Sequence, residues 1–305
     1  MEAQVHPSTP SPGLDEARVT VRGVGLPVLE AGPRDSREAV VFVHGNPGSG
    51  QDWTDLLRQT GEFARAVAPD MPGFGRADKP RDFPYSVDGY ARFLDDVLSE
   101  LGIDRVHLVV HDFGGPWGME WAARNPSRTA SAVLINTGAL VGYHWHVLAR
   151  IWRTPVLGEV FQATATRPLF RLLTNLGQKR KLPRSFLDHA YDVNFTRPTR
   201  RAVLKLYRAT SDPGEIGRRQ AEALRPHDIP AVVVWGARDP YIPVATADRQ
   251  HEAFPGAAVH VFEDSGHWPF VDDPERTAAI VVPFLREQAT SRIEGERRAP
   301  QARST

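Results

Sequence analysis

RVHLVVHDFGGPWG, residues 105–118, is the stretch that decides the fold of this chain. Its first half is apolar and β-branched, which predicts a buried parallel strand. The run reaches Asp112 and then passes through two glycines into Trp117–Asn125, a plausible helix. A sharp turn between a strand and a helix lifts one side chain clear of the sheet, as in a nucleophile elbow. We therefore expect Asp112 at such a turn, where serine is the more usual residue.

An aspartate at this turn predicts a particular chemistry. A carboxylate attacks amides and esters poorly, but it can displace a leaving group from a saturated carbon. Water then opens the resulting alkyl ester at its carbonyl carbon. The alternative is that Asp112 only caps the helix that follows, as aspartate often does.

The composition limits the class of protein. A chain of 305 residues with 41% hydrophobic content can bury the core of one large domain, or of a domain with an insertion. Because 37 basic side chains balance 37 acidic ones, the net charge gives no reason to expect nucleic acid or an anionic membrane as a partner. The lack of cysteine excludes disulfides, thiolate metal sites and cysteine nucleophiles.

The amino-terminal segment, Met1–Leu14, is rich in proline and serine and has no apolar core, unlike a secretory signal. No apolar run approaches the length that crosses a bilayer. We therefore expect a cytoplasmic protein whose partners are a small molecule and water. The sequence gives no indication of its oligomeric state.

Outward from residues 105–118, strand-like and helix-like segments alternate as in a mostly parallel sheet with helices on both faces. Residues 17–22 and 27–31 predict an antiparallel pair, and Ser86–Leu101 predicts a helix that stops at Gly102. The remaining predictions are strands at 39–44, 65–69, 130–136, 231–235 and 258–262 and a closing helix at 277–287.

The alternation stops between residues 138 and 228, where helical patterns occur without a clear strand. This stretch is too long and too apolar for a simple loop, so we expect a helical cap over the carboxyl edge of the sheet. The predicted organisation is a disordered leader (1–15), a core (16–137 and 229–290), the cap (138–228) and a polar tail (291–305).

A glycine turn follows the strand predicted at residues 39–44. Residues 44–48 are HGNPG, and a turn at Gly45 can orient the backbone N–H of Asn46 toward Asp112. With the N–H of Phe113, this predicts an oxyanion hole with two donors. The alternative is an ordinary turn from a strand into a helix.

An acid and a base complete the set. Asp239 ends the strand predicted at 231–235 and is placed to orient an imidazole, although an aspartate before proline often only begins a turn. His267, just past the last strand, is predicted to take a proton from water, although histidine is also common at surfaces. The order nucleophile, acid, histidine is that of one fold.

These segments resemble the α/β-hydrolase superfamily, in its branch of epoxide hydrolases and haloalkane dehalogenases. The resemblance runs from Val19 to Leu285. It depends on His44-Gly45-x-Pro47, on His111-Asp112-x-Gly114-Gly115 and on the run PDMPGFGRADKP at 69–80. It implies an eight-stranded sheet with a helical lid, no cofactor, and a two-step reaction through a covalent alkyl-enzyme ester.

The two subfamilies differ in how they stabilise the leaving group. Similar haloalkane dehalogenases hold the halide with an amide at the position of Asn46 and a tryptophan N–H directly after the nucleophile. Here Phe113 has no such donor, a loss on the order of 1.5–3 kcal/mol in a dry pocket. A cap tryptophan, Trp145 or Trp152, is the possible substitute.

Two more features separate the chain from dehalogenases. In some of them the acid follows the sixth strand, where this chain has Asn136, so Asp239 is the better acid. The run Tyr143-His-Trp145 is similar to the fluoride site of fluoroacetate dehalogenases. That family has an arginine after its nucleophile, where Phe113 stands here, and Phe113 favours a neutral, apolar substrate.

Epoxide hydrolases need phenol donors in the cap, because an opening epoxide becomes an alkoxide. The run Leu204-Lys-Leu-Tyr-Arg-Ala209 is similar to their cap motif, which makes Tyr207 the first candidate. Tyr143 is the second and Tyr191 the reserve. The alternative for each is a packing residue with its hydroxyl at the rim.

We therefore expect a hydrolase, most simply an epoxide hydrolase that makes a vicinal diol. Haloalkane dehalogenase is the second hypothesis, and a non-hydrolytic binding or rearrangement role on the same fold is the third. In each, Trp145, Trp152 and Trp268 are expected to line the substrate pocket.

Overall fold

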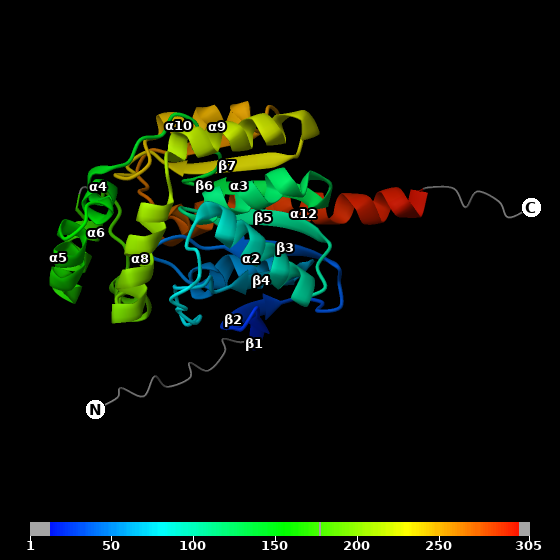
Figure 1. Cartoon of the computed structure of the whole chain (residues 1–305). Coiled ribbons are helices and arrows are strands. Elements are labelled where there is room, and N and C mark those ends of the chain that lie inside the picture. The colour runs from blue at the N-terminus through cyan, green and yellow to red at the C-terminus, as the bar shows by residue number, and fades with distance from the viewer. Residues whose placement is uncertain (1–12, 177, 299–305) are drawn as a thin grey trace, which may run out of the picture.

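Eight strands form one sheet in the order β1-β2-β4-β3-β5-β6-β7-β8 (Figure 1). The structure is a computed structural model that describes residues 13–176 and 178–298. β2 runs antiparallel to β1 and to β4, and the other neighbours are parallel. The expected mostly parallel, eight-stranded sheet is confirmed. Its strands are β1 (Asp15–Val21), β2 (Val24–Ala31), β3 (Glu38–Val43), β4 (Arg65–Pro69), β5 (Arg105–His111), β6 (Thr129–Ile135), β7 (Ala231–Gly236) and β8 (Ala258–Phe262).

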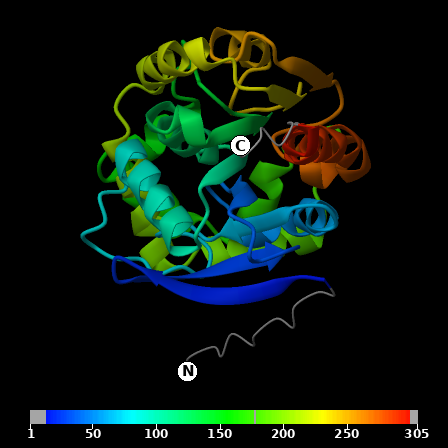
Figure 2. The same ribbon diagram turned by 90° about the vertical axis from the view of Figure 1, so that its right-hand side faces the viewer.

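Helices cover both faces of the sheet because its central strands are apolar on both sides. In β3, Val41 and Val43 pack in one hydrophobic cluster while Val40 and Phe42 pack in the other. Figure 2 shows α2 and α12 on opposite sides of the sheet. The helices of this core are α1 (Thr54–Gly61), α2 (Val87–Glu100), α3 (Gly114–Arg124), α9 (Pro213–Leu224), α10 (Ala245–Asp248), α11 (Pro269–Asp272) and α12 (Pro274–Arg298). Short 3-10 turns lie at Gly50–Trp53, Pro126–Arg128, Arg225–His227 and Arg249–Glu252.

Five helices form the cap, which lies beyond the ends of the parallel strands (Figure 1). They are α4 (Val147–Arg153), α5 (Leu157–Thr164), α6 (Arg167–Thr174), α7 (Arg184–Asn194) and α8 (Arg197–Ala209). The next helix, α9, falls in the range 138–228 that the sequence assigned to the cap, but it packs beside α3 on the core. There the Gln220 side chain donates to the backbone oxygen of Pro116 at 2.9 Å.

Several boundaries differ from the predicted ones. Leu14 is buried and β1 begins at Asp15, so the folded core begins before residue 16, where the sequence predicted its start. Residues 1–12 of the predicted leader lie outside the described range. The closing helix α12 continues to Arg298, through most of the predicted polar tail. Helix α3 begins at Gly114, three residues before the predicted start. In the described ranges, no helix combines the length and the apolar character that crossing a membrane requires.

Gly114 fixes the distance between β3 and the turn that carries Asp112. A Cβ at Gly114 would lie 2.1 Å from the backbone oxygen of Val43. That oxygen belongs to a central strand and cannot move aside. We predict that Gly114→Ala lowers the free energy of unfolding by about 1–3 kcal/mol, the usual cost of overpacking.

Urea unfolding of both proteins measures this difference. Gly256→Ala is the matched control, because a Cβ there meets nothing within 4 Å, and it should stay within about 0.5 kcal/mol of the unsubstituted chain. Equal stability of the Gly114 and Gly256 variants would show that β3 and the turn are not in this close contact.

Candidate active site

Asp112 occupies the turn between β5 and α3, with a φ of 49°. This left-handed conformation is rare outside glycine and is held only where the surroundings fix it. The Thr137 hydroxyl donates to the Asp112 backbone oxygen at 2.6 Å, and the Gly115 N–H donates to the same oxygen at 3.0 Å. The residue before α3 is Phe113, without a side-chain cap. The alternative that Asp112 serves only as a helix cap is therefore wrong.

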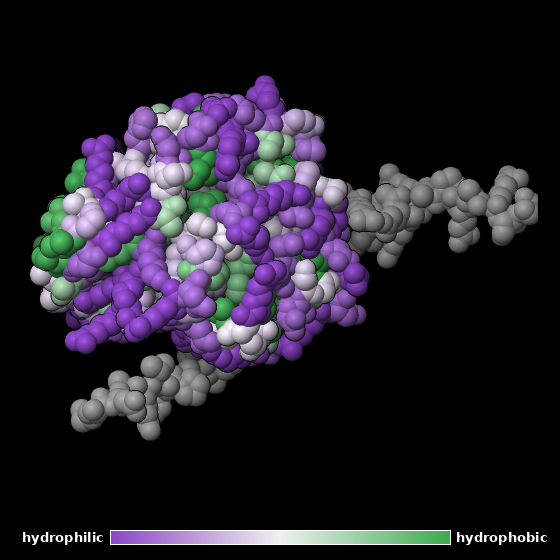
Figure 3. Space-filling view, in the orientation of Figure 1, coloured by the Kyte–Doolittle hydropathy of each residue, from purple (hydrophilic) through white to green (hydrophobic). Residues whose placement is uncertain are grey.

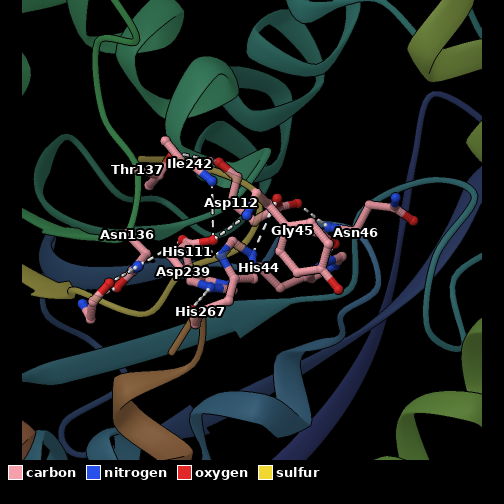
Figure 4. A network of polar contacts seen from close by, with 12 residues as sticks. His44, Gly45, Asn46, His111, Asp112, Asn136, Thr137, Asp239, Ile242 and His267 are labelled. Carbon is pink, nitrogen blue, oxygen red and sulfur yellow. Dashed lines mark hydrogen bonds and ion pairs between the residues drawn. The ribbon is translucent and has the colours of Figure 1, made fainter. Parts of the chain in front are cut away.

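The turn after β3 holds one oxygen of this carboxylate. The backbone N–H of Asn46 donates to Asp112 Oδ1 at 2.6 Å (Figure 4). A Cβ at Gly45 would lie 2.3 Å from Asp112 Cβ, so only glycine permits this approach. The N–H of Asn46 thus lies where the predicted oxyanion hole requires it. The corresponding role of Phe113 stays a prediction.

His44 fixes the direction of that turn. Its Nε2 accepts the N–H of Met71 at 2.9 Å, so the ring proton is on Nδ1, which donates to the Gly45 oxygen at 2.8 Å. Burial lowers the pKa of His44 and keeps it neutral, despite the nearby Asp70. The neutral ring, in this one tautomer, therefore fixes the backbone of Gly45 and so the position of the Asn46 N–H that follows it.

His267 lies between two carboxylates. Its Nδ1 is 2.7 Å from Asp239 Oδ2, and its Nε2 is 3.4 Å from Asp112 Oδ2. All three side chains are nearly inaccessible, with 2% of His267, 12% of Asp112 and none of Asp239 exposed. The structure thus brings together the three residues that the sequence assigned as nucleophile, acid and base.

The charges of the neighbouring side chains outweigh burial in setting the pKa values of His267 and Asp112. Burial alone would lower the pKa of His267, but Asp239 and Asp112 together raise it to about 10. Burial opposes ionisation of Asp112, yet His267 and the Asn46 N–H hold its pKa below the ordinary value. The resting site is therefore an imidazolium between two carboxylates.

Asn136 orients the acid. Its amide donates to Asp239 Oδ2 at 2.7 Å, and its Oδ1 accepts the N–H of Gly236 at 2.8 Å. The N–H groups of Tyr241 and Ile242 donate to Asp239 Oδ1 at 2.7 and 3.0 Å. Asn136 follows β6, the position at which the sequence comparison with dehalogenases suggested an alternative acid. In this chain its amide instead holds Asp239, which follows β7. Its place at a strand end was visible in the sequence, but its partner was not.

His111 holds the backbone of the base. Burial and the neighbouring His267 lower the pKa of His111 to about 3, so its ring is neutral at ordinary pH. Its Nε2–H donates to the backbone oxygen of His267 at 2.7 Å. Sequence reasoning treated His111 only as part of a motif.

Two cavities meet at Asp112 beneath the cap. The first runs toward α5 and α6, and the second runs between α3 and α9. Four residues line both cavities: Asp112, His146, Tyr207 and Tyr241. Most other lining side chains are apolar or aromatic, so the space in front of Asp112 suits a small apolar substrate.

The three predicted tyrosines lie in different places. Tyr207, on α8, lines both cavities, and its hydroxyl lies 3.5 Å from Asn46 Nδ2. Tyr143 lines the second cavity. Tyr191 lines neither, and its hydroxyl donates to the Ala165 oxygen at 3.0 Å. Burial raises the pKa of Tyr207 and of Tyr143, so both phenols stay protonated.

The three predicted tryptophans all line a cavity. Trp145 lines the second and donates its indole N–H to the Ser211 oxygen at 3.3 Å. Trp152 and Trp268 line the first, and within the described ranges neither buried Nε1 has a hydrogen-bond partner. The indole N–H of Trp152 is therefore without a partner in the described ranges, whereas that of Trp145 is already engaged.

Sequence reasoning missed His146 and Tyr241. The Nδ1 of His146 accepts the N–H of Ala149 at the start of α4, at 3.1 Å, which leaves the proton on Nε2. Burial lowers the pKa of His146 to about 4, so this ring is a neutral donor. Tyr241 packs against His146 and His267, with ring centroids 5.2 and 5.0 Å away. The only signal for Tyr241 was its position two residues after Asp239.

The part of the chain that the structure describes contains no group of three or more His, Asp or Glu side chains placed to hold a metal ion.

Comparison with known proteins agrees with this geometry. The family model described as the alpha/beta hydrolase fold matches residues 38–274. The chain is 30% identical over 295 residues to a cis-3-alkyl-4-alkyloxetan-2-one decarboxylase of Xanthomonas campestris, covering 88% of this chain and 94% of the relative. It is also 30% identical over 266 residues to an uncharacterised protein of Mycobacterium tuberculosis, covering 82% of this chain and 76% of the relative.

Solved structures show the same fold. Haloalkane dehalogenase DbeA from Bradyrhizobium elkani superposes with a TM-score of 0.78 at 22% identity, covering 90% of this chain and 98% of that one. DatA from Agrobacterium tumefaciens gives a TM-score of 0.75 at 22% identity, covering 91% and 98%. The predicted superfamily is confirmed: this chain belongs to the α/β-hydrolase fold family.

Proposed function

We propose that this hydrolase opens small apolar epoxides to vicinal diols, through an ester on Asp112. The observation that supports this most is the phenol of Tyr207. The Asn46 side chain lies in position to donate to its oxygen, and the ring is held edge-on by Phe113 at 5.0 Å between centroids. The phenol proton is therefore free to point at a substrate in front of Asp112.

In the first step, Asp112 Oδ2 attacks one epoxide carbon. The carbon–oxygen bond of the ring breaks, and its electron pair goes to the ring oxygen. Tyr207 donates its proton to that oxygen and becomes a phenolate, because an alkoxide is a far stronger base than a phenolate. Oδ1 stays with the Asn46 N–H and becomes the carbonyl oxygen of the ester.

Further donors surround the same space. Tyr143 lines the second cavity, and burial raises its pKa, so its phenol stays protonated. His146, whose ring is a neutral donor, and Tyr241 line both cavities as well. We propose Tyr143 as the second phenol donor, as the resemblance implies, with His146 beside it.

The second step begins with loss of the His267 proton, through solvent, to the Tyr207 phenolate. Water then attacks the ester carbonyl carbon, and the neutral imidazole takes a proton from this water. The bond between the carbonyl carbon and Oδ2 breaks, the imidazolium protonates Oδ2 of the departing diol, and the acid group left on Asp112 returns its proton to His267. Esterification removes the charge of Asp112, one of the two carboxylates that raise the His267 pKa. The pKa of His267 therefore falls once the ester has formed, and the imidazole becomes a base when one is needed. Asp239 stabilises the imidazolium that results, and the Asn46 N–H stabilises the oxyanion.

Haloalkane dehalogenase is a second candidate, favoured by the unpartnered indole N–H of Trp152. With the Asn46 amide it could hold a halide in place of the donor that Phe113 lacks. A third candidate follows from the relative named for acting on cis-3-alkyl-4-alkyloxetan-2-ones. These are also strained oxygen rings, and their decarboxylation is a non-hydrolytic outcome on the same fold.

A product assay separates the three candidates. We predict diol from styrene oxide, with little halide from short haloalkanes and little carbon dioxide from a cis-dialkyl oxetan-2-one. Tyr207→Phe should lower kcat for diol formation about 10²–10⁴-fold, the usual contribution of a general acid.

Tyr191→Phe is the matched control, because its hydroxyl binds Ala165 outside both cavities, and its kcat should stay within about twofold. Halide release or carbon dioxide release that exceeds diol formation would replace the epoxide proposal by the corresponding alternative.

Replacing the base should stop the reaction at the ester. We predict that His267→Gln still reacts with styrene oxide but releases diol poorly, so the intact protein gains the mass of one substrate molecule. Mass spectrometry locates the gain on the peptide that holds Asp112. Asp112→Asn in the same background should gain no mass, and diol formation without any ester would contradict the scheme.

The two steps should respond differently to pH. Because the pKa of Asp112 is lowered, the alkylation rate should stay flat from about pH 5 to about pH 9. Ester hydrolysis should slow as the pH falls through the pKa of His267 in the ester, which lies below the resting value of about 10. Stopped-flow single turnovers measure both rates, and an alkylation rate that needs a group deprotonated between about pH 6 and pH 8 would contradict this assignment.

A further inference from the structure

Exposed aliphatic side chains are concentrated on the outer cap. Of the nine large apolar side chains that are exposed within the described ranges, only Val244 lies on the core. Figure 3 shows hydrophobic green gathered at the left margin of the molecule, over the cap, with hydrophilic purple around it. We call the other side chains of this set the apolar cap patch: Val147, Val156, Leu157, Val160, Leu169, Leu172, Leu173 and Leu176.

The apolar cap patch is continuous with the entrance to the first cavity. Leu169 and Leu173, on α6, line that cavity and are also 36% and 43% exposed. Leu172 and Leu176 extend the same helix outward and are 62% and 65% exposed. An apolar molecule could thus pass from the patch toward Asp112 along one apolar surface.

The segment that carries the patch is strongly basic. Residues 147–184 contain eight Lys and Arg side chains and one acidic one, Glu159. The whole predicted cap, 138–228, has sixteen basic and seven acidic side chains, a formal charge of +9. Because the whole chain is neutral, the rest carries −9. The balanced total, which gave no reason to expect a membrane partner, therefore conceals opposite charges on the two parts.

Three of these cations border the patch without an acidic partner in the part of the chain that the structure describes. Arg150 donates to the Trp145 oxygen at 2.9 Å, and Lys181 donates to the Asn175 oxygen at 2.9 Å. Arg200 donates to the Ala165 oxygen, between α5 and α6, at 3.1 Å. Their charges are held next to the aliphatic side chains but are not neutralised.

We propose that the apolar cap patch docks on the surface of an anionic lipid bilayer, with the entrance of the first cavity facing the lipid. Aliphatic side chains enter the boundary between headgroups and acyl chains, while the surrounding cations bind the anionic headgroups. A symmetric pair of caps would place the same basic segments against each other, so the charge disfavours a second copy as the occupant.

This proposal does not depend on the reaction at Asp112, because lipid binding is measured without turnover. If the proposed function also holds, docking would supply apolar substrates that are concentrated in the membrane rather than in water. Failure of either proposal would leave the other standing.

Vesicle sedimentation of the full-length chain tests the docking. We expect binding to vesicles that contain phosphatidylglycerol and phosphatidylcholine, weaker binding as salt is raised, and at least tenfold weaker binding to phosphatidylcholine alone. Arg150→Gln and Lys181→Gln should each weaken binding about fivefold. Arg225→Gln is the matched control, an exposed arginine that also donates to a backbone oxygen, that of Glu252, but at the far end of α9.

The aliphatic side chains need their own test. Leu172→Glu with Leu176→Glu should weaken binding on the order of tenfold or more. Val244→Glu places one such charge on the core, at the one large aliphatic side chain that is exposed outside the cap in the described ranges, and should change binding less than twofold. Circular dichroism melting identifies any variant that does not fold. If the glutamate variant does not fold, Arg150→Gln and Lys181→Gln still test the proposal.

Three outcomes would overturn the proposal: no binding to either vesicle, equal binding to both compositions without salt dependence, or binding that the cap substitutions leave unchanged. Analytical ultracentrifugation adds a fourth. Self-association that Leu172→Glu with Leu176→Glu abolishes, in the absence of vesicle binding, would make a second copy the occupant.

Discussion

The site depends on one buried cation shared by two carboxylates. His267 lies 2.7 Å from Asp239 and 3.4 Å from Asp112, where an unpaired charge would be costly. Neither carboxylate is left without a donor, because Asn136 and two backbone N–H groups hold one and the Asn46 N–H holds the other. In the proposed mechanism, esterification removes the charge of Asp112 and thereby turns His267 into a base, an effect that a serine at this turn could not have.

The architecture and the triad could be predicted because each residue follows a strand. Asp112, Asp239 and His267 follow β5, β7 and β8, whose carboxyl ends meet at one edge of the sheet. The parallel strands β3, β4, β6, β7 and β8 were placed within one residue of their bounds because parallel strands buried in a sheet are continuous apolar runs, whereas the antiparallel β2 begins three residues before its predicted start. The same reasoning placed Asn46 at the edge, from the glycine turn after β3.

The rest of the site needed coordinates, because it depends on how the cap sits over the sheet. His146 lies on a segment without a strand-end signal, and Tyr241 lies two residues beyond the strand-end residue Asp239. The contacts of both come from the orientation of α4 and of the loop after β7. The free donor proved to be on Trp152 and not on Trp145, which only the partner at Ser211 reveals. The basic character of residues 147–184 was readable from the sequence, but the neutral total concealed it.

The central claim is that the substrate becomes transiently esterified to Asp112. Repeated turnover of styrene oxide in water labelled with oxygen-18, followed by digestion and mass spectrometry of the Asp112 peptide, tests it most directly. Because hydrolysis occurs at the ester carbonyl, we predict that solvent oxygen enters this carboxylate while the first diol formed carries unlabelled oxygen from the enzyme. An unlabelled Asp112 peptide, with labelled oxygen in the diol from the first turnover onward, would contradict the account.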